Sequence, residues 1–229
     1  MGGTIVVTGA TSGLGLALVR QLKAAGYQPV LTGRNKEKVD ALATELGVTG
    51  YQMDVSDAGS IQQVSAQIID ELGSVDGLIN NAGIWLEGDF ETYSPTQIQQ
   101  VVATNTTGTI LTTHAFLSDM LGRGSGTVIN TVSTGALYCR KMISVYAASK
   151  WAIRGFTGCM EVECAPKGVR VMGFYPGKID SNMYETAGVS RDLEVAMTPE
   201  QGAEMVVAML QAKGMVWSQV SGRAITDYQ

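Results

Sequence analysis

Histidine and cysteine are scarce in this 229-residue chain, which contains one histidine and three cysteines. The one histidine, His114, leaves no second candidate for a Ser-His-Asp triad, and we expect it to serve in packing or at an interface. The cysteines are odd in number and have no CxxC spacing, which is typical of reduced, partly buried thiols in a cytosolic protein. We expect neither a disulfide framework nor a metal site.

Positive charge is also in short supply. The chain has 16 Lys and Arg residues against 21 Asp and Glu residues, and its net charge is −5. Binding to nucleic acid requires a basic face, so we expect no nucleic-acid partner. Apolar runs are only a few residues long, far short of the roughly 20 needed to span a membrane. The N-terminus also has no signal-peptide pattern, and we therefore expect a cytoplasmic protein without membrane contact.

Glycine and apolar residues are plentiful, with 28 glycines and 45% of residues apolar. Short apolar runs alternate with segments of helical periodicity, and several segments begin with Ser-Pro or Thr-Pro capping signals. Strands are expected at 4–8, 29–33, immediately before 54, 78–80, 127–132 and 169–175, and long helices after 94 and over 144–164. Apolar strands separated by helices predict a doubly wound parallel sheet, a Rossmann fold with helices on both faces. We expect residues 1–229 to form one domain.

A glycine-rich turn, TGATSGLG at 8–15, stands between the first expected strand and the first expected helix. Glycines there let backbone N–H groups approach a pyrophosphate at the helix N-terminus. A GxxxGxG pattern arises by chance about 0.4 times in a chain of this composition, so the pattern alone is weak evidence. The prediction of phosphate binding rests on its place directly between an expected strand and an expected helix. The cofactor contacts expected in this turn are Gly9, Thr11, Ser12, Gly13, Leu14 and Gly15.

The end of the second expected strand favours NADP(H) over NAD(H). In dinucleotide-binding folds, a carboxylate about 20 residues beyond the glycines binds the adenosine ribose of NAD. Gly33 stands at that place and offers neither an acceptor nor a charge that would repel a phosphate. Arg34 follows, and its guanidinium can bind a 2′-phosphate through paired hydrogen bonds, with Ser12 as a further donor. The alternative is that Arg34 is a solvated residue at a strand end.

Ser133, Tyr146 and Lys150 form a second set of candidate residues. Tyr146 and Lys150 are four residues apart on an expected helix and therefore share a face. A tyrosine can protonate a developing alkoxide, and a neighbouring ammonium lowers its pKa and favours the reverse reaction. A YxxxK pair with Ser 13 residues before the Tyr is expected about 0.02 times by chance. The alternative is an exposed helical Tyr and Lys with an unrelated Ser.

Together these motifs resemble the short-chain dehydrogenase/reductase superfamily, in its compact single-domain branch, over nearly the whole chain. They occur in the family's order: TGATSGLG, Asp54-Val55, NNAG at 80–83, Asn105, Ser133, YAASK at 146–150 and PGKIDS at 176–181. Ser181 stands where the family usually has Thr and keeps the hydroxyl. The resemblance implies an NADP(H)-dependent oxidoreductase that interconverts a carbonyl and an alcohol on a small molecule.

The resemblance also implies a role for each motif residue. Tyr146 would be the general acid/base, and Ser133 would hydrogen-bond the same substrate oxygen. Lys150 would bind the nicotinamide ribose and lower the pKa of Tyr146, and Asn105 would hold a water between Lys150 and solvent. Further implied cofactor contacts are Asp54 and Val55 at the adenine, Asn81, Ala82 and Gly83 at the adenosine ribose, and Pro176, Gly177, Ile179 and Ser181 at the nicotinamide.

The positions that border the substrate in this family imply an apolar pocket, although core packing explains any one of them equally well. They are Trp85, Tyr138, Met142, Met183 and Tyr184. The resemblance further implies a homodimer or homotetramer, paired through the helix after Ser94-Pro95 and the helix that carries Tyr146.

Two other functions are compatible with parts of the pattern. A dinucleotide-sensing protein without turnover would use the glycine-rich turn but has no use for Ser133, Tyr146 and Lys150 together. A dehydratase or epimerase of the longer relatives would add a C-terminal substrate domain, for which the chain after PGKIDS leaves no room. An oxidoreductase is the expected function.

Overall fold

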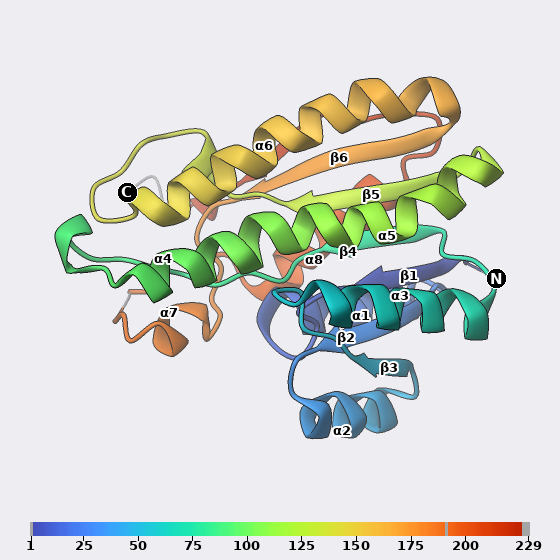
Figure 1. Cartoon of the computed structure of the whole chain (residues 1–229), viewed down its shortest axis with the longest axis horizontal. Helices are drawn as coiled ribbons and strands as arrows, with labels where there is room; N and C mark the ends of the chain where they lie inside the picture. Colours follow the sequence, from blue (N-terminus) through green and yellow to red (C-terminus); the bar gives the residue numbers. More distant parts are fainter. Residues whose placement is uncertain (1, 191, 226–229) are drawn as a thin grey trace.

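The computed structural model, which describes residues 2–190 and 192–225, contains one seven-stranded sheet whose strands are all parallel (Figure 1). The strand order is β3-β2-β1-β4-β5-β6-β7. The strands are β1 (Thr4–Val7), β2 (Gln28–Gly33), β3 (Thr49–Gln52), β4 (Gly77–Asn80), β5 (Gly126–Thr131), β6 (Val169–Pro176) and β7 (Gln219–Gly222). The order reverses between β1 and β4, where such sheets open a crevice at the carboxyl ends of their strands. The predicted doubly wound sheet is confirmed.

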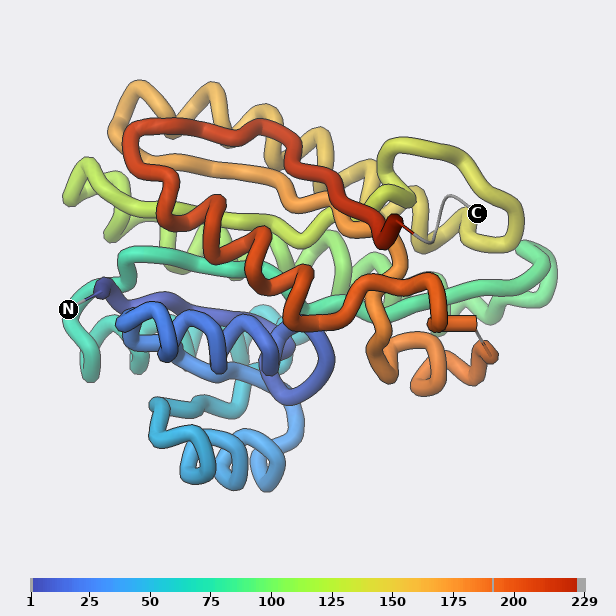
Figure 2. Tube along the Cα trace, turned by 180° about the vertical axis from the view of Figure 1, so that it is seen from behind, coloured from blue at the N-terminus to red at the C-terminus, as the bar shows by residue number. Residues whose placement is uncertain are grey.

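Helices cover both faces of this sheet, and each face has its own apolar cluster. One cluster contains Leu18, Leu22 and Val206, and the other contains Ile68 and Phe116. Figure 2 shows the fold from the other side. The first cluster includes residues of α1 (Gly13–Ala24), α2 (Lys36–Leu46) and α8 (Pro199–Gln211), and the second those of α3 (Ala58–Leu72), α5 (Gly108–Arg123) and α6 (Ser144–Cys164).

The helix expected after Ser94-Pro95 is interrupted. Its first part, α4 (Pro95–Val102), begins with the predicted capping box, in which the Ser94 side chain and Gln97 bond each other's backbone N–H groups. A π-helical segment, Ala103–Thr107, then joins α4 to α5. A π-helical turn changes which side chains face inward and is frequent at functional sites. It includes Asn105, which is fully buried.

The seventh strand, β7, is absent from the strands expected from the sequence. Its four residues, QVSG, include two polar ones and form no apolar run, and their burial alternates between exposed and intermediate. The strand exists because its backbone pairs with the end of β6, where Gly173 lies opposite Gln219 and Pro176 opposite Gly222. It follows α8, and a short helix, α7 (Met183–Thr186), lies between β6 and α8.

The described residues also bear on four expectations from composition. Cys164 is buried, but Cys139 and Cys159 are exposed, so the expected burial holds for one thiol only. His114, expected to serve in packing or at an interface, is exposed, so of the two roles only the interface stays a prediction. Within 2–190 and 192–225, no helix has the length and apolar character to cross a bilayer, and no group of three or more His, Cys, Asp or Glu is placed to bind a metal.

Arg170, on β6, holds the C-terminal end of α8 against the sheet. Helix ends leave carbonyl groups without intrahelical partners, and cations near that end are stabilising. The guanidinium donates to the carbonyls of Leu210 and Ala212, each at 2.8 Å, and to the Thr127 hydroxyl at 2.8 Å. One side chain therefore connects β5, β6 and α8.

Replacing Arg170 with Met should lower the free energy of unfolding by about 2–3 kcal/mol, because several charge-assisted hydrogen bonds are lost while the apolar stem is kept. Urea unfolding followed by circular dichroism measures the change. Arg20→Met is the matched control, since Arg20 forms only an exposed pair with Glu45 at 3.5 Å, worth about 0–1 kcal/mol. Equal losses in the two variants would show that Arg170 does not secure α8.

Candidate active site

A cleft of about 1630 Å³ opens at the carboxyl ends of the strands. A drug-sized ligand occupies a pocket of about 300–1,000 Å³, so this cleft has room for a dinucleotide and a small substrate together. Every catalytic and cofactor residue predicted from the sequence lines it except Asn105, which is buried. The loops after β1, β2, β4, β5 and β6 meet here, since parallel strands end at the same edge of the sheet.

The glycine-rich turn forms one wall of the cleft and leads directly into α1. Gly9 has a left-handed backbone, with φ of 62°, and a Cβ there would lie 2.8 Å from the Cα of Ala82. Ser12 is the N-cap of α1 but makes no side-chain capping bond, so the first N–H groups of the helix stay available to a ligand. This arrangement is suited to a phosphate group.

Asn81 and Thr8 hold the turn against the end of β4. The Thr8 hydroxyl accepts hydrogen bonds from the backbone N–H groups of Asn81 and Ala82, each at 3.0 Å. The Asn81 amide donates in return to the carbonyls of Thr8 at 3.0 Å and Gly9 at 3.2 Å. The side chain of Asn81, predicted to meet a ribose, is thus engaged in shaping the loop.

Ser133, Tyr146 and Lys150 are brought together at the centre of the cleft. Ser133 follows β5, and the other two lie one turn apart on α6. The hydroxyl of Ser133 is hydrogen-bonded to the Tyr146 phenol. Lys150 lies 5.9 Å from the centre of the Tyr146 ring and donates to the Thr131 carbonyl at 2.9 Å. The sequence pattern thus corresponds to one cluster in space.

Burial governs the pKa values of both ionisable groups in this cluster. Desolvation raises the pKa of Tyr146, while the hydrogen bond from Ser133 and the charge of Arg140 lower it and Tyr184 raises it. Desolvation also lowers the pKa of Lys150 to about 8. The expected lowering of the Tyr146 pKa by Lys150 is not among these effects; burial dominates and the net shift is upward, because water that would stabilise the phenolate is excluded.

Ser133 has a strained backbone. Its φ of 148° and ψ of 153° lie in a region that residues other than glycine rarely adopt, at a cost of about 1–3 kcal/mol. Its hydroxyl accepts a hydrogen bond from the Gly135 N–H at 3.0 Å, which begins the 3₁₀ turn Thr134–Ala136. Such strain is concentrated at functional sites, where it orients a side chain that an unstrained backbone would direct elsewhere.

Asn105 supports the cluster from below. Its amide oxygen accepts from the Ile84 N–H at 2.8 Å, and its amide nitrogen donates to the Ile84 carbonyl at 3.0 Å and to the Ser149 hydroxyl at 3.1 Å. Ser149 donates in turn to the Tyr146 carbonyl at 2.7 Å. The donors and acceptor of the amide are thus committed to the protein, and the water between Lys150 and solvent stays a prediction.

The adenosine end of the cleft contains Arg34 and Lys38, both exposed and neither in an ion pair with a residue that the structure describes. A Cβ at Gly33 would lie 2.7 Å from a methyl group of Thr11, so a larger residue requires Thr11 to move. Asp54 lines this end and accepts hydrogen bonds from Ser56. It does not cap α3, because Asp57 does.

The segment after β6 closes the cleft on the other side. A Cβ at Gly13 would lie 2.9 Å from the Cβ of Ser181, so this segment contacts the glycine-rich turn. Ile179 pairs with Met197, which anchors the segment to the beginning of α8. The predicted nicotinamide-side residues Pro176, Gly177, Ile179 and Ser181 all line this part of the cleft.

An apolar cluster stands beside Tyr146 at the substrate end. The Trp85 ring centre is 4.3 Å from that of Tyr146 and 5.0 Å from that of Tyr184, and Met183 packs against them. Met142, expected to border the substrate, does not line the cleft. Its carbonyl instead accepts hydrogen bonds from the Gly88 N–H and the Tyr93 hydroxyl, at 2.9 Å each, because φ of 65° turns the backbone there.

Sequence reasoning missed four basic residues that line the cleft: Lys38, Arg140, Lys178 and Arg223. Arg223 follows β7, and its guanidinium lies over the Tyr138 ring, 5.1 Å from the ring centre. Lys178 lies within the PGKIDS segment, but only its neighbours were predicted as contacts. No motif marks the other three, and β7 itself has no sequence signal. Of those three, only Lys38 could have been found from the sequence, since it is four residues beyond Arg34 at the beginning of an expected helix.

The chain is similar to known oxidoreductases in sequence and structure. A curated relative, an uncharacterized oxidoreductase of Staphylococcus epidermidis, is 34% identical over 182 residues, which is 79% of each chain. An alcohol dehydrogenase of the archaeon Thermococcus sibiricus, complexed with 5-hydroxy-NADP, has 26% identity and a TM-score of 0.87 over 99% of this chain and 98% of that one. The closed form of a serine dehydrogenase complexed with NADP⁺ has 27% identity and a TM-score of 0.92, over 97% and 95%.

A family model described as short chain dehydrogenase matches residues 3–191, which include every site residue predicted from the sequence. The match covers the glycine-rich turn, the strained serine and the Tyr-Lys helix, which lie together around the cleft. The protein belongs to the short-chain dehydrogenase/reductase family of oxidoreductases.

Proposed function

We propose that the protein is an NADP(H)-dependent oxidoreductase that interconverts a carbonyl and an alcohol on a small molecule, with Tyr146 as the general acid/base. The observation that carries this proposal is the hydrogen bond between the Ser133 hydroxyl and the buried Tyr146 phenol, beside the buried Lys150. The Ser133 hydroxyl can donate a hydrogen bond and the Tyr146 phenol can donate a proton to the same substrate oxygen, which gains negative charge during carbonyl reduction.

The residues of the cleft fit a dinucleotide. The N-terminus of α1, whose N–H groups have no side-chain cap, suits a pyrophosphate. A side chain at Gly9 would collide with Ala82, so the glycine-rich turn has no side chain at that position. Arg34 and Lys38 suit a 2′-phosphate at the adenosine end. Two similar solved structures contain NADP⁺ and 5-hydroxy-NADP, which supports this choice. Bound here, NADPH supplies a hydride for the carbonyl carbon.

The protein's own residues supply the proton and the electrostatics. Tyr146 gives its proton to the substrate oxygen during reduction and takes it back during oxidation. Burial raises the pKa of Tyr146 and keeps the phenol protonated, as reduction requires. Ser133 donates to the same oxygen, and Lys150 adds positive charge next to the phenol while its proton is bound. The Trp85 and Tyr184 rings exclude water from this end.

A cofactor sensor without turnover is the alternative function. The strained backbone of Ser133 favours the enzyme, because strain of this kind persists where a side chain must be held for a reaction. Binding a dinucleotide alone does not require a hydroxyl beside Tyr146.

Association of two or more copies stays a prediction. The Trp151 side chain on α6 is 42% exposed, and Val162 is 74% exposed on the same helix. These apolar groups lie outside the core and suit a symmetric interface through α6.

Tyr146→Phe should reduce turnover by at least about 10²-fold while leaving the affinity for NADPH within a few-fold, since only the proton donor is lost. Steady-state absorbance of NADPH with a panel of aldehydes and ketones measures turnover, and NADPH fluorescence measures binding. Tyr51→Phe is the matched control, because Tyr51 is buried away from the cleft and bonded to Glu71 at 2.6 Å. Near-normal activity of the Tyr146 variant would sink the proposed mechanism.

Ser133→Gly and Ser133→Ala should lose turnover alike, by roughly 10²-fold, because both remove the hydroxyl. Their stabilities should differ, with the Gly variant about 1 kcal/mol more stable than the Ala variant, since only glycine relaxes at the observed φ. Urea unfolding and steady-state kinetics measure the two effects. Equal stability of the variants would argue against backbone strain.

Arg34→Ala should weaken NADPH binding by about 10- to 100-fold and leave NADH binding nearly unchanged, because NADH has no 2′-phosphate. The ratio of kcat/KM for the two cofactors on one substrate measures the preference. Lys36→Ala is the matched control, since Lys36 is exposed, paired with Asp40 at 2.7 Å and outside the cleft. A wild-type enzyme that already prefers NADH would disprove the cofactor assignment.

A further inference from the structure

The cleft is basic although the protein is acidic. The net charge of the chain is −5. Among the described residues that line the cleft, however, only one, Asp54, is acidic, whereas six are basic: Arg34, Lys38, Arg140, Lys150, Lys178 and Arg223. A cleft lined by one sign of charge attracts ligands of the opposite sign. Its ligands are therefore expected to be anionic.

A dinucleotide accounts for only one group of these charges. Arg34 and Lys38 lie at the adenosine end with Asp54, and the pyrophosphate is served by the N-terminus of α1. Arg140, Lys178 and Arg223 come from the loops after β5, β6 and β7 and also line the cleft. Arg140 acts electrostatically on Tyr146, which lies against the apolar cluster of Trp85, Met183 and Tyr184, and Arg223 lies over the Tyr138 ring. The second basic group thus faces the substrate.

Arg140 is the member of this group that is best placed to bind a substrate. It stands in the loop between the 3₁₀ turn and α6, and it lines the cleft together with Tyr138, Ile143 and Tyr146. It is exposed, and it forms no ion pair or hydrogen bond with the residues that the structure describes. Its charge acts on the Tyr146 phenol and lowers the pKa of that group, which places it within electrostatic reach of the reacting atoms.

We propose that the substrate is a carbonyl or alcohol with an anionic group, a carboxylate or a phosphate, which the Arg140 guanidinium binds while the reacting oxygen lies at Ser133 and Tyr146. This inference rests on the proposed oxidoreductase function. The planar guanidinium forms paired hydrogen bonds with either anion. Lys178 and Arg223 add positive potential on the same side of the cleft. The apolar cluster of Trp85, Met183 and Tyr184 contacts the carbon chain that joins the anionic group of the substrate to its reacting carbonyl or alcohol.

The test compares charged and neutral members of matched substrate pairs with NADPH. The pairs are 4-oxopentanoate and its methyl ester, succinic semialdehyde and its methyl ester, and dihydroxyacetone phosphate and dihydroxyacetone. The charged member of at least one pair should have the higher kcat/KM, by about 10- to 100-fold, through a lower KM. The first two pairs report a carboxylate and the third a phosphate.

Arg140→Gln should remove this preference: the ratio of kcat/KM for the charged member to that for its neutral partner should fall toward one, through a higher KM for the charged member. Any effect of the lost charge on Tyr146 changes kcat for both members alike and cancels in this ratio. Lys141→Gln is the matched control, since it removes the same charge from the next residue, which is exposed and outside the cleft. Its preference should equal that of the wild type. A wild type that turns over neutral carbonyls without preferring any charged partner overturns the inference and leaves the proposed function intact. A preference that survives in Arg140→Gln overturns it as well.

Binding without turnover gives a separate readout. Trp85 lines the cleft beside Tyr146, and its fluorescence should report occupation of the substrate end. Titration of the wild type with NADP⁺ present should show saturable quenching by 4-oxopentanoate or dihydroxyacetone phosphate, weaker with the neutral partner and weaker in Arg140→Gln. If no carbonyl is reduced but this pattern appears, the proposed function fails and the anion site stands. If neither anion quenches more strongly than its neutral partner, the anion site fails.

Discussion

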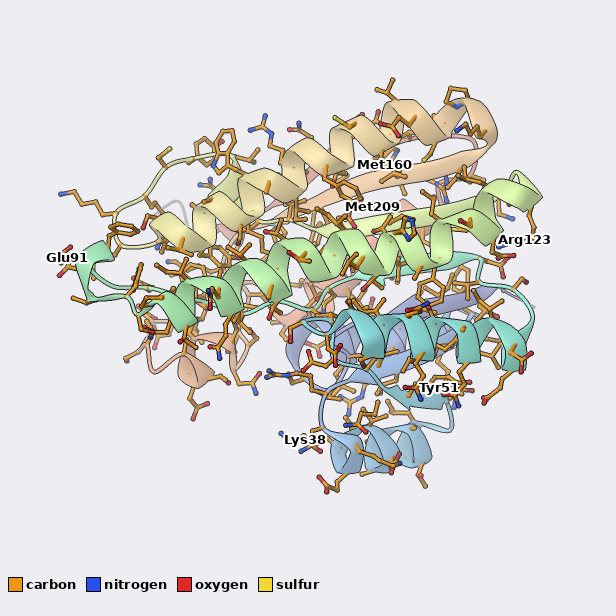
Figure 3. The ribbon with its side chains drawn as sticks, in the orientation of Figure 1. Lys38, Tyr51, Glu91, Arg123, Met160 and Met209 are labelled. Atoms are coloured by element: carbon orange, nitrogen blue, oxygen red, sulfur yellow. The ribbon has the colours of Figure 1, made fainter. Side chains whose placement is uncertain are left out.

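The active-site geometry depends on one buried amide, that of Asn105. Its oxygen and nitrogen bond both backbone groups of Ile84, which follows the NNAG segment, and its nitrogen also donates to Ser149 on α6. The loop after β4, the π-helical segment and the Tyr-Lys helix are therefore fixed to one another at a single point. A buried amide without these partners would cost several kcal/mol, so the three elements can pack together only in this register. Figure 3, in the orientation of Figure 1, shows α4 and α5 running beside α6.

Exclusion of water is the second constraint on the site. It raises the pKa of Tyr146, which keeps the phenol neutral, and lowers the pKa of Lys150 to about 8. Charge at the phenol is therefore stabilised by neighbouring protein groups: Ser133 by a hydrogen bond, Arg140 by its charge, and Lys150 while it is protonated. This is why the strained backbone of Ser133 matters for the chemistry: its hydroxyl must be held where bulk water is absent.

The stable frame and the reactive cleft are built from different parts of the chain. Strands and helices supply the apolar clusters on the two faces of the sheet, and groups such as Arg170 join them far from the reaction. The residues that meet ligands come from the loops at the carboxyl ends of the strands. Separation of the two lets the cleft have a basic lining within an acidic protein, because loop side chains contribute little to the core.

The sequence by itself determined the sheet type, the glycine-rich turn, the Ser-Tyr-Lys set and the place of Arg34 at the end of a strand, since each is a local pattern tied to a strand end or a helix turn. The apolar runs of β1, β4, β5 and β6 can be recognised as buried strands without knowledge of their neighbours.

Other features were decided only by tertiary structure. The strand β7 exists through its pairing with β6, and the π-helical turn at Asn105 becomes favourable only when Ile84 and Ser149 meet its amide. The convergence of Arg140, Lys178 and Arg223 on the substrate end has the same origin: they lie on loops far apart in the chain, and no periodicity relates residues that only the sheet order brings together.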